Sequence, residues 1–313
     1  MAFARAGLPA ALALVAIVPF VTDAYWQSLI LQMLIFGLLA LSVDLLLGHA
    51  GLFSLCHAAF FAASAYTVAI LQVRYGAPTM VAVPAALAVG TGLAAIFGIA
   101  VRTRGVYFIL ITIALGYVVW GMAYRWAGFT GGDNGIVNVP LPAAGGWSIT
   151  SPTAYYYLAL AVVTLCVIAY RRLVGSPFGL ALRGIKGSES RMRSLGYAPT
   201  LHLYVAFVLS GALAAVAGVL YVYFNRFVNP VAASFPISVE AALMVIIGGT
   251  GTILGPFLGA GIILGLRNWV SGFVEQYTAI IGLVFIVAVL WAPDGIVGLS
   301  RRLRARWAGK APP

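Results

Sequence analysis

Two carboxylates are the side chains best placed to do chemistry inside the apolar stretches of this sequence. Asp44 and Glu240 both lie within such stretches, in a chain that has only 7 Asp and Glu residues among 313. A buried carboxylate is costly, so its retention indicates either a polar pathway or a hydrogen bond or ion pair that holds elements together. Both are therefore candidates for a polar pathway, and a structural role is the alternative for each.

A second cluster of residues with reactive or polar side chains lies within positions 49–57, namely His49, Ser54, Cys56 and His57. Histidine and cysteine are common metal ligands, but this spacing gives no complete ligand set, and we predict no metal site. We expect His57 to form a hydrogen bond between packed helices, or, with Ser54, to line the same pathway. The sequence has no serine triad, no paired catalytic carboxylates and no cofactor loop, so we expect neither enzymatic activity nor a bound cofactor.

The composition identifies the class of protein. The chain is 63% hydrophobic and only 8% charged, which excludes an ordinary soluble domain. Apolar runs of about 18 or more residues recur along it, each long enough to cross a hydrocarbon core of roughly 30 Å. We therefore predict an all-α polytopic membrane protein. One transmembrane domain is expected over residues 1–300, followed by a basic cytoplasmic tail over 301–313.

About ten transmembrane helices are expected from the apolar runs. Placing both termini in the cytoplasm puts fourteen Lys and Arg residues inside and four outside, as the positive-inside rule requires. The net charge of +11 therefore reflects topology and contact with lipid, and we expect no nucleic-acid partner. The expected spans are 7–22, 25–47, 54–72, 80–101, 106–124, 154–173, 203–224, 238–248, 253–269 and 277–292.

The cytoplasmic segment 175–200 is predicted to form two short helices. Ser176 and Pro177 give an N-cap and a first-turn proline, and Gly187 offers a left-handed end. Ser188 can cap a second helix that Gly196 closes. An apolar face on the first helix is expected to fit a groove of a protein partner, and attraction of the basic residues to anionic lipid is the alternative.

A glycine-rich segment over residues 125–153 is expected on the outer side. Thr130, Asp133 and Asn134 lie within it, among several glycines. These residues could seat an external protein or gate an exit, or they could serve only as turn formers.

Five segments of the chain, in this order, resemble the LivM-type permease subunits of branched-chain amino acid ABC importers. They cover most of the sequence between residues 25 and 299. The segments are LLLGHAGLFSLCHAAFFAASAYT (45–67), RTRGVYFILITIALG (102–116), FTGGDNGI (129–136), SPFGLALRGIKGSESRMRSLGY (176–197) and SVEAALMVIIGGTGTILGPFLGA (238–260).

The resemblance implies a permease subunit of the bacterial inner membrane that works by alternating access. Its implied partners are a second, LivH-like permease, two cytoplasmic ATPases that bind ATP and Mg, and a periplasmic substrate-binding protein. It also implies that the 175–200 segment couples the chain to an ATPase. The residues expected to couple are Ser176, Pro177, Arg183, Lys186, Glu189, Arg191, Arg193 and Gly196.

The expected substrate is a branched-chain amino acid or another small hydrophobic amino acid. Related permeases of this kind carry urea, short amides or aromatic acids, and these are alternatives within the same architecture. A secondary transporter and a channel are the competing classes; the first should show inverted repeats with broken helices, and the second should conduct without nucleotide.

Overall fold

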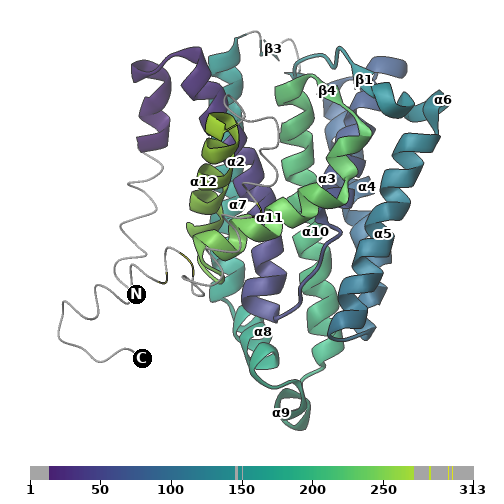
Figure 1. Cartoon of the computed structure of the whole chain (residues 1–313), viewed down its shortest axis with the longest axis vertical. Helices are drawn as coiled ribbons and strands as arrows, with labels where there is room; N and C mark the ends of the chain where they lie inside the picture. The colour runs from purple at the N-terminus through teal and green to yellow at the C-terminus, as the bar shows by residue number, and fades with distance from the viewer. Residues whose placement is uncertain are drawn as a thin grey trace.

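The computed structural model describes residues 14–144, 147–149 and 151–270, with Gly282, Gly295 and Gly298. Residues 14–21 are helical, and the elements that follow form one bundle of helices (Figure 1). The main helices are α2 (Ala24–Asp44), α3 (His57–Ala69), α4 (Thr79–Phe97), α5 (Val106–Arg125), α7 (Pro152–Gly175), α10 (Pro199–Asn225), α11 (Phe235–Gly248) and α12 (Gly255–Val270).

Short elements extend or connect these helices. Two π-helical turns prolong α2 and α3, and a 3-10 turn prolongs α4; they are η1 (Leu45–Ala50), η2 (Ile70–Arg74) and η3 (Gly98–Arg102). The remaining connections hold α6 (Ala127–Thr130), η4 (Gly132–Asn134), β1 (Ile136–Val137), β2 (Ala143–Ala144), β3 (Trp147–Ser148), α8 (Pro177–Gly187), α9 (Glu189–Ser194), β4 (Phe227–Val228) and η5 (Pro230–Ala233).

Five helical stretches in the described part are long and apolar enough to cross a membrane. They are Ala24–Ala50, Thr79–Arg102, Val106–Arg125, Pro152–Gly175 and Pro199–Asn225. The all-α membrane class is confirmed, and the helices lie close to the expected spans. The expected spans 54–72, 238–248 and 253–269 correspond to the shorter helices α3, α11 and α12. Span 277–292, apart from Gly282, and the tail 301–313 lie outside the described residues, as does the first half of span 7–22.

The core of the bundle is built on α2 and α10. Residues 34–46 are buried on every side of α2, and α10 packs against α2, α3 and α4. Burial by protein on every side, rather than apolar character alone, places α2 at the centre, because an apolar face in a membrane can also meet lipid. By contrast, α4, α5 and α7 bury less than a third of their apolar stretches, so they form the outside of the bundle.

Glycines allow α10 to approach its neighbours closely. At Gly218 there is no room for a side chain, because a Cβ atom would overlap the carbonyl oxygen of Phe61 and the hydroxyl of Ser64 on α3. Gly211 faces Ala94 of α4 in the same way. Small residues at contacts of this kind bring backbones together and strengthen van der Waals packing inside a membrane.

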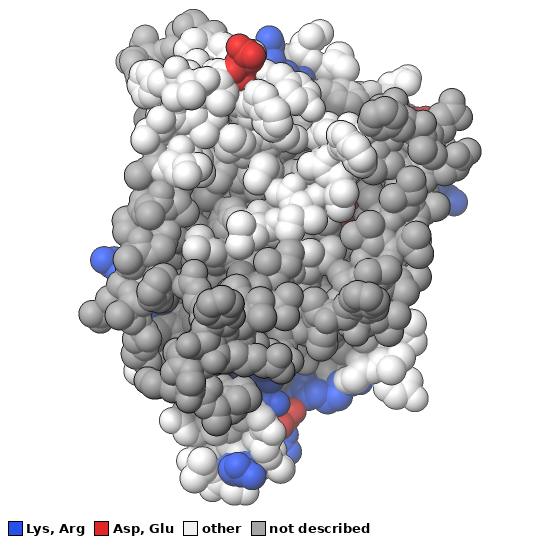
Figure 2. Space-filling model, turned by 60° about the vertical axis from the view of Figure 1, so that its left-hand side comes forward, with Lys and Arg blue, Asp and Glu red and all other residues white. Residues whose placement is uncertain are grey.

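The two ends of the bundle differ in structure. At one end α7 leads into α8 and α9, and at the other β1 pairs antiparallel with β4 (Figure 1). That pairing joins the two loops that we expected outside, 125–153 and 225–237. Lys and Arg gather mainly at the end of α8 and α9 on the face shown in Figure 2.

Candidate functional site

Asp44 joins three parts of the bundle at the C-terminal end of α2. Its carboxylate accepts a 2.8 Å hydrogen bond from the Tyr170 hydroxyl of α7 and a 2.7 Å bond from the backbone N–H of Gly251. His49 Nδ1 lies 3.9 Å from the same carboxylate. The Asp44 side chain is fully buried, and each of its oxygens has a partner. The cost of burying the carboxylate is therefore offset by hydrogen bonds between helices.

The Asp44 carboxylate lies where two breaks in the helical structure meet. One break is η1 with the non-helical residues 51–56, and the other is the linker 249–254 between α11 and α12. Gly48 has no room for a side chain, because a Cβ atom there would overlap the Gly251 backbone nitrogen and the Asp44 carboxylate. Gly251 itself has a φ of +69°, which favours glycine. Non-helical backbone at this depth is tolerated because protein surrounds it.

Lys186 of α8 contacts the same break from the other side. Its ammonium donates a 2.8 Å hydrogen bond to the carbonyl oxygen of Gly48 and a 3.4 Å bond to that of Leu47. These carbonyls lie in the last turn of η1, where a cation is favoured by unpaired backbone oxygens. The segment 175–200 is thus tied directly to the backbone around Asp44.

The two short helices of segment 175–200 form as expected. The hydroxyl of Ser176 accepts from the Gly179 N–H and that of Ser188 from the Arg191 N–H, so both N-caps are present. Pro177 opens α8, and Gly196 ends the second helix with a φ of +85°. The predicted left-handed end at Gly187 is wrong: the helix includes this residue and ends at Ser188 in an extended conformation.

The apolar face of α8 packs against the chain itself. Ala181, Leu182 and Ile185 are buried, and α8 contacts α7, η1 and α10. The expectation that this face fits a groove of another protein is therefore wrong, because the face is already covered. Leu180, a further apolar residue of α8, is 61% exposed. Arg183 donates a 3.1 Å bond to the carbonyl oxygen of Val174 in the last turn of α7.

Glu189 attaches α9 to the connection between α4 and α5. The Arg104 guanidinium donates two hydrogen bonds to its carboxylate, of 2.8 and 2.9 Å, and Arg193 donates a third of 3.0 Å. The hydrogen bonds from Arg104 hold the pKa of the Glu189 carboxyl below its ordinary value of 4.5. A paired geometry of this kind is stronger and more specific than a single contact.

The outer side of α9 stays open. No residue of α9 is buried, and Arg191 and Arg193 are exposed. Leu195 and Tyr197, which follow the helix, are 67% and 46% exposed. These four residues make an exposed surface of mixed apolar and basic character, which we call the α9 surface.

His57 and Ser54 lie in the core, apart from Asp44. His57 Nε2 is 2.6 Å from the Ser210 hydroxyl of α10, which itself donates a 2.5 Å bond to the carbonyl oxygen of Ser42. Ser210 has only one hydroxyl proton, so the imidazole must donate through Nε2. This chain of bonds links α3, α10 and α2. Ser54 is buried beside Cys56, with its oxygen 3.4 Å from the sulfur.

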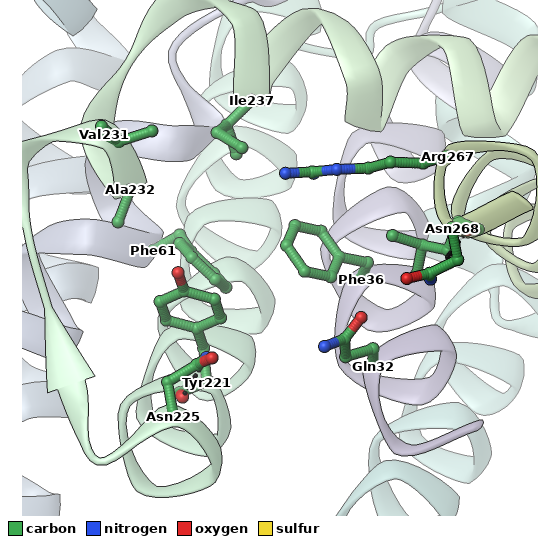
Figure 3. Close-up of a pocket in the computed structure, with 11 residues that line it drawn as sticks. Gln32, Phe36, Phe61, Tyr221, Asn225, Val231, Ala232, Ile237, Arg267 and Asn268 are labelled. Atoms are coloured by element: carbon green, nitrogen blue, oxygen red, sulfur yellow. Dashed lines mark hydrogen bonds between the residues drawn. The ribbon is translucent and has the colours of Figure 1, made fainter. Parts of the chain in front are cut away.

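Glu240 of α11 contacts a residue that lines a cavity of about 270 Å³. Its Oε2 is 3.7 Å from Nη1 of Arg267, which projects over the cavity from α12 (Figure 3). Phe36, Phe61 and Leu264 form a buried apolar floor. Polar side chains surround that floor, namely Gln32, Asn225, Arg267 and Asn268, together with Tyr221. We call this the outer cavity.

Thr130 serves the fold of the loop after α5. Its buried hydroxyl lies 2.6 Å from the carbonyl oxygen of Ala123 and 2.9 Å from that of Trp126, and it accepts from the Gly132 N–H. Asp133 and Asn134, by contrast, are exposed at the end of the bundle away from α8. The Thr130 side chain thus stabilises the turn, whereas the side chains of Asp133 and Asn134 remain exposed and could contact an external protein.

Comparison with known proteins identifies the family. Residues 25–290 match the family described as "Branched-chain amino acid transport system / permease component". The chain belongs to this permease family. It is a multi-pass membrane protein, and its role is that of the permease of an ABC importer.

Similarity to individual permeases extends over most of the chain. The high-affinity branched-chain amino acid transport permeases LivM of Salmonella typhimurium and of Escherichia coli are each 28% identical to it over 307 residues, covering 90% of this chain and 72% of the relative. LivH of Escherichia coli is 29% identical over 48% of this chain and 49% of its own length. No solved structure matches the chain.

In this permease, the four predicted pathway residues do not form one site. Asp44 and His57 belong to separate hydrogen-bond networks in the core, Ser54 contacts Cys56, and Glu240 pairs with Arg267 of the outer cavity.

The sequence alone did not point to Tyr170, Ser210 and Gly251, which supply the hydrogen-bond partners in these networks. It also did not point to the polar residues around the outer cavity. Gln32 and Ser210 did carry a signal, because each is a polar residue inside an apolar span.

Proposed function

We propose that this permease moves branched-chain or related small hydrophobic amino acids across the bacterial inner membrane, as the transmembrane subunit of an ATP-driven importer. The observation that carries the proposal is the match to two LivM permeases over 90% of the chain. Both of those relatives transport branched-chain amino acids, as their names state. Transport proceeds by alternating access between the two faces of the bundle.

The partners follow from the same assignment. A second permease of the LivH kind completes the membrane part, and similarity of this chain to both LivM and LivH supports such a pair. Two cytoplasmic ATPases bind ATP and Mg and supply the energy, and a periplasmic binding protein delivers the substrate. Asp133 and Asn134 are exposed at the end where that protein would dock.

Coupling to an ATPase takes place through the α9 surface. Arg191, Arg193, Leu195 and Tyr197 are the exposed residues that meet the ATPase, and the buried face of α8 fixes this surface to the bundle. A displacement of α9 moves α8 with it, and Lys186 transmits the movement to the carbonyl oxygens of Leu47 and Gly48. Asp44 then passes it to α7 through Tyr170 and to the linker 249–254 through Gly251.

The orientation is with both termini in the cytoplasm and ten membrane-spanning helices. Two contacts support the assignment of the connecting segments to common sides of the membrane, and the distribution of Lys and Arg gives the direction. Arg104 and Glu189 come from segments that we assign to the cytoplasm, and they contact each other. The strands β1 and β4 come from segments that we assign to the outside, and they pair.

Site-directed cross-linking tests the assignment of the α9 surface. Cys56 and Cys166 are replaced by alanine, and Leu195→Cys is introduced beside a matched control, Leu165→Cys, which is exposed on the outside of α7. We expect a short bifunctional reagent to join Leu195→Cys, but not Leu165→Cys, to a co-purified ATPase. Equal cross-linking at both positions would contradict the docking assignment.

An uptake panel tests the substrate. A strain without its own branched-chain uptake receives the permease together with its partner subunits, and uptake of labelled leucine, isoleucine and valine is compared with that of phenylalanine, urea and acetamide. We expect uptake of the first three. Uptake restricted to urea or acetamide, or to aromatic acids, would replace the amino-acid assignment with one of those alternatives.

A further inference from the structure

The outer cavity combines three kinds of surface in one small space. Its floor is apolar, because Phe61 and Leu264 are almost completely buried and Phe36 is only 7% exposed. A guanidinium, that of Arg267, extends across the cavity above the Phe36 ring (Figure 3). Carboxamides at Gln32 and Asn225 complete the polar side. Small-molecule sites have this composition: an apolar lining with a few polar groups that fix orientation.

The polar groups can recognise both signs of charge. Arg267 carries five N–H donors in a planar fork, a geometry that suits a carboxylate, and its Nη1 lies 3.7 Å from Oε2 of Glu240. Asn225 is oriented differently, because its Nδ2 donates a 3.0 Å bond to the Tyr221 carbonyl oxygen. Its Oδ1 is therefore the atom that it offers as an acceptor, and an acceptor suits an ammonium group.

The position and size of the cavity suit only a small ligand. Its volume of about 270 Å³ is just below the roughly 300–1,000 Å³ found for pockets that bind drug-sized molecules. Asn225 ends α10 directly before β4, at the end of the bundle away from α8 and α9 (Figure 1). The cavity also touches α12, which leads back to the linker 249–254 and its contact with Asp44.

From this geometry we propose that the outer cavity is a binding site for a zwitterionic amino acid with a small apolar side chain. The Arg267 guanidinium binds the carboxylate, Asn225 Oδ1 accepts from the ammonium, and Phe36, Phe61 and Leu264 contact the apolar side chain. The inference rests on the proposed function, since it locates within this chain a place where the transported substrate is held.

Equilibrium binding of labelled L-leucine tests the site. The full-length permease is purified with its partner permease in detergent, without the periplasmic binding protein. Two competitors separate the charges: 4-methylpentanoate lacks the ammonium group of leucine, and 3-methylbutylamine lacks its carboxylate. We expect leucine to bind, 4-methylpentanoate to compete more weakly than leucine, and 3-methylbutylamine to compete least.

Arginine variants add a second readout. Arg267→Gln is expected to weaken leucine binding at least several-fold, and Arg267→Lys is expected to weaken it less because the charge is kept. The matched control is Arg125→Gln, which removes an exposed arginine at the C-terminal end of α5, outside the cavity, and should leave binding unchanged. Because the competitors act on the unaltered protein, the test does not depend on the folding of any variant.

Three results would overturn the inference: no leucine binding by the unaltered permease, equal binding by Arg267→Gln, or equal competition by 3-methylbutylamine. None of these would remove the proposed function, which depends on ATP-driven uptake by the assembled importer. Conversely, failure of uptake together with specific binding would overturn the transport role and leave the site standing.

Discussion

The ammonium of Lys186 lies 2.8 Å from the carbonyl oxygen of Gly48, although 138 residues separate them in the chain. Gly48 belongs to the π-helical turn that continues α2, and Lys186 belongs to the helix that follows α7. This contact joins the segment proposed to meet the ATPase to the broken backbone in the bundle. The proposed transmission of movement from α9 to the bundle depends on this contact.

Replacing Lys186 with methionine should separate ATP hydrolysis from transport. Methionine keeps most of the side-chain volume and removes the donor, so α8 loses its hold on η1 while its apolar face stays buried. We expect the amount of leucine transported per ATP hydrolysed to fall several-fold in proteoliposomes. Arg172→Met, which removes an exposed charge from the same end of the bundle, should leave the ratio unchanged. A normal ratio in Lys186→Met would rule out this contact as the coupling step.

Removing the Asp44 carboxylate should cost stability. Asp44→Ala removes the partner of two donors, the Tyr170 hydroxyl and the Gly251 N–H, and the buried Tyr170 hydroxyl left unsatisfied costs about 1–3 kcal/mol. Tyr170→Phe removes one hydrogen bond between helices, which is worth about 0.6 kcal/mol on average in a membrane protein. The measurement is unfolding of the purified permease in detergent. In the double variant the Tyr170 change should lower the cost of Asp44→Ala, because it removes the unpaired hydroxyl, and purely additive effects would argue against the shared bond.

Attachment of α9 should depend on pH through Glu189. The pKa of its carboxyl is lower in the folded chain than its ordinary value of 4.5, so the contact with Arg104 contributes fully above pH 4.5. The contribution is lost as pH falls through the lower, folded pKa. A spin label at Leu195→Cys, in a chain without Cys56 and Cys166, should therefore become more mobile below about pH 4.5. In Glu189→Gln the label should already be mobile at neutral pH. If the mobility of the label in the parent chain did not change with pH, the ion pair between Glu189 and Arg104 would not be what holds α9 in place.

Two glycine-to-alanine changes should have opposite effects on stability. In Gly218→Ala the new methyl group meets the carbonyl oxygen of Phe61, and overpacking of this kind costs about 1–3 kcal/mol. In Gly121→Ala the methyl group meets no atom within 4 Å, so the higher helix propensity of alanine should stabilise by about 0.5–1 kcal/mol. Unfolding midpoints in detergent distinguish the two. A neutral Gly218→Ala would mean that α3 and α10 are less closely packed than described.

The membrane helices could be predicted from the sequence because an apolar run has one dominant solution in a bilayer. Expected spans such as 106–124 and 253–269 lie within two residues of α5 and α12 at each end. The N-caps at Ser176 and Ser188 were also predictable, since capping is a local interaction. The π-helical turn η1 was not, and it lies against Gly251, a residue 207 positions from Asp44 whose proximity no local pattern indicates.

The site could be predicted only in part, for a similar reason. Sequence position showed that Asp44 and Glu240 are unusual, but it could not show that one is fully hydrogen-bonded and the other pairs with Arg267. The apolar residues of α8 indicated an amphipathic helix correctly. They could not indicate which surface covers that face, because a protein partner and the bundle itself offer similar apolar contacts.

Uptake of labelled leucine into proteoliposomes is the most direct test of the central claim, that this permease is driven by separate ATPases. The vesicles contain both permeases and the binding protein, with or without the ATPase subunits. We expect uptake only when the ATPases and ATP are both present, and none with ATPases unable to hydrolyse ATP. Undiminished uptake without the ATPases would contradict it and indicate a secondary transporter or a channel.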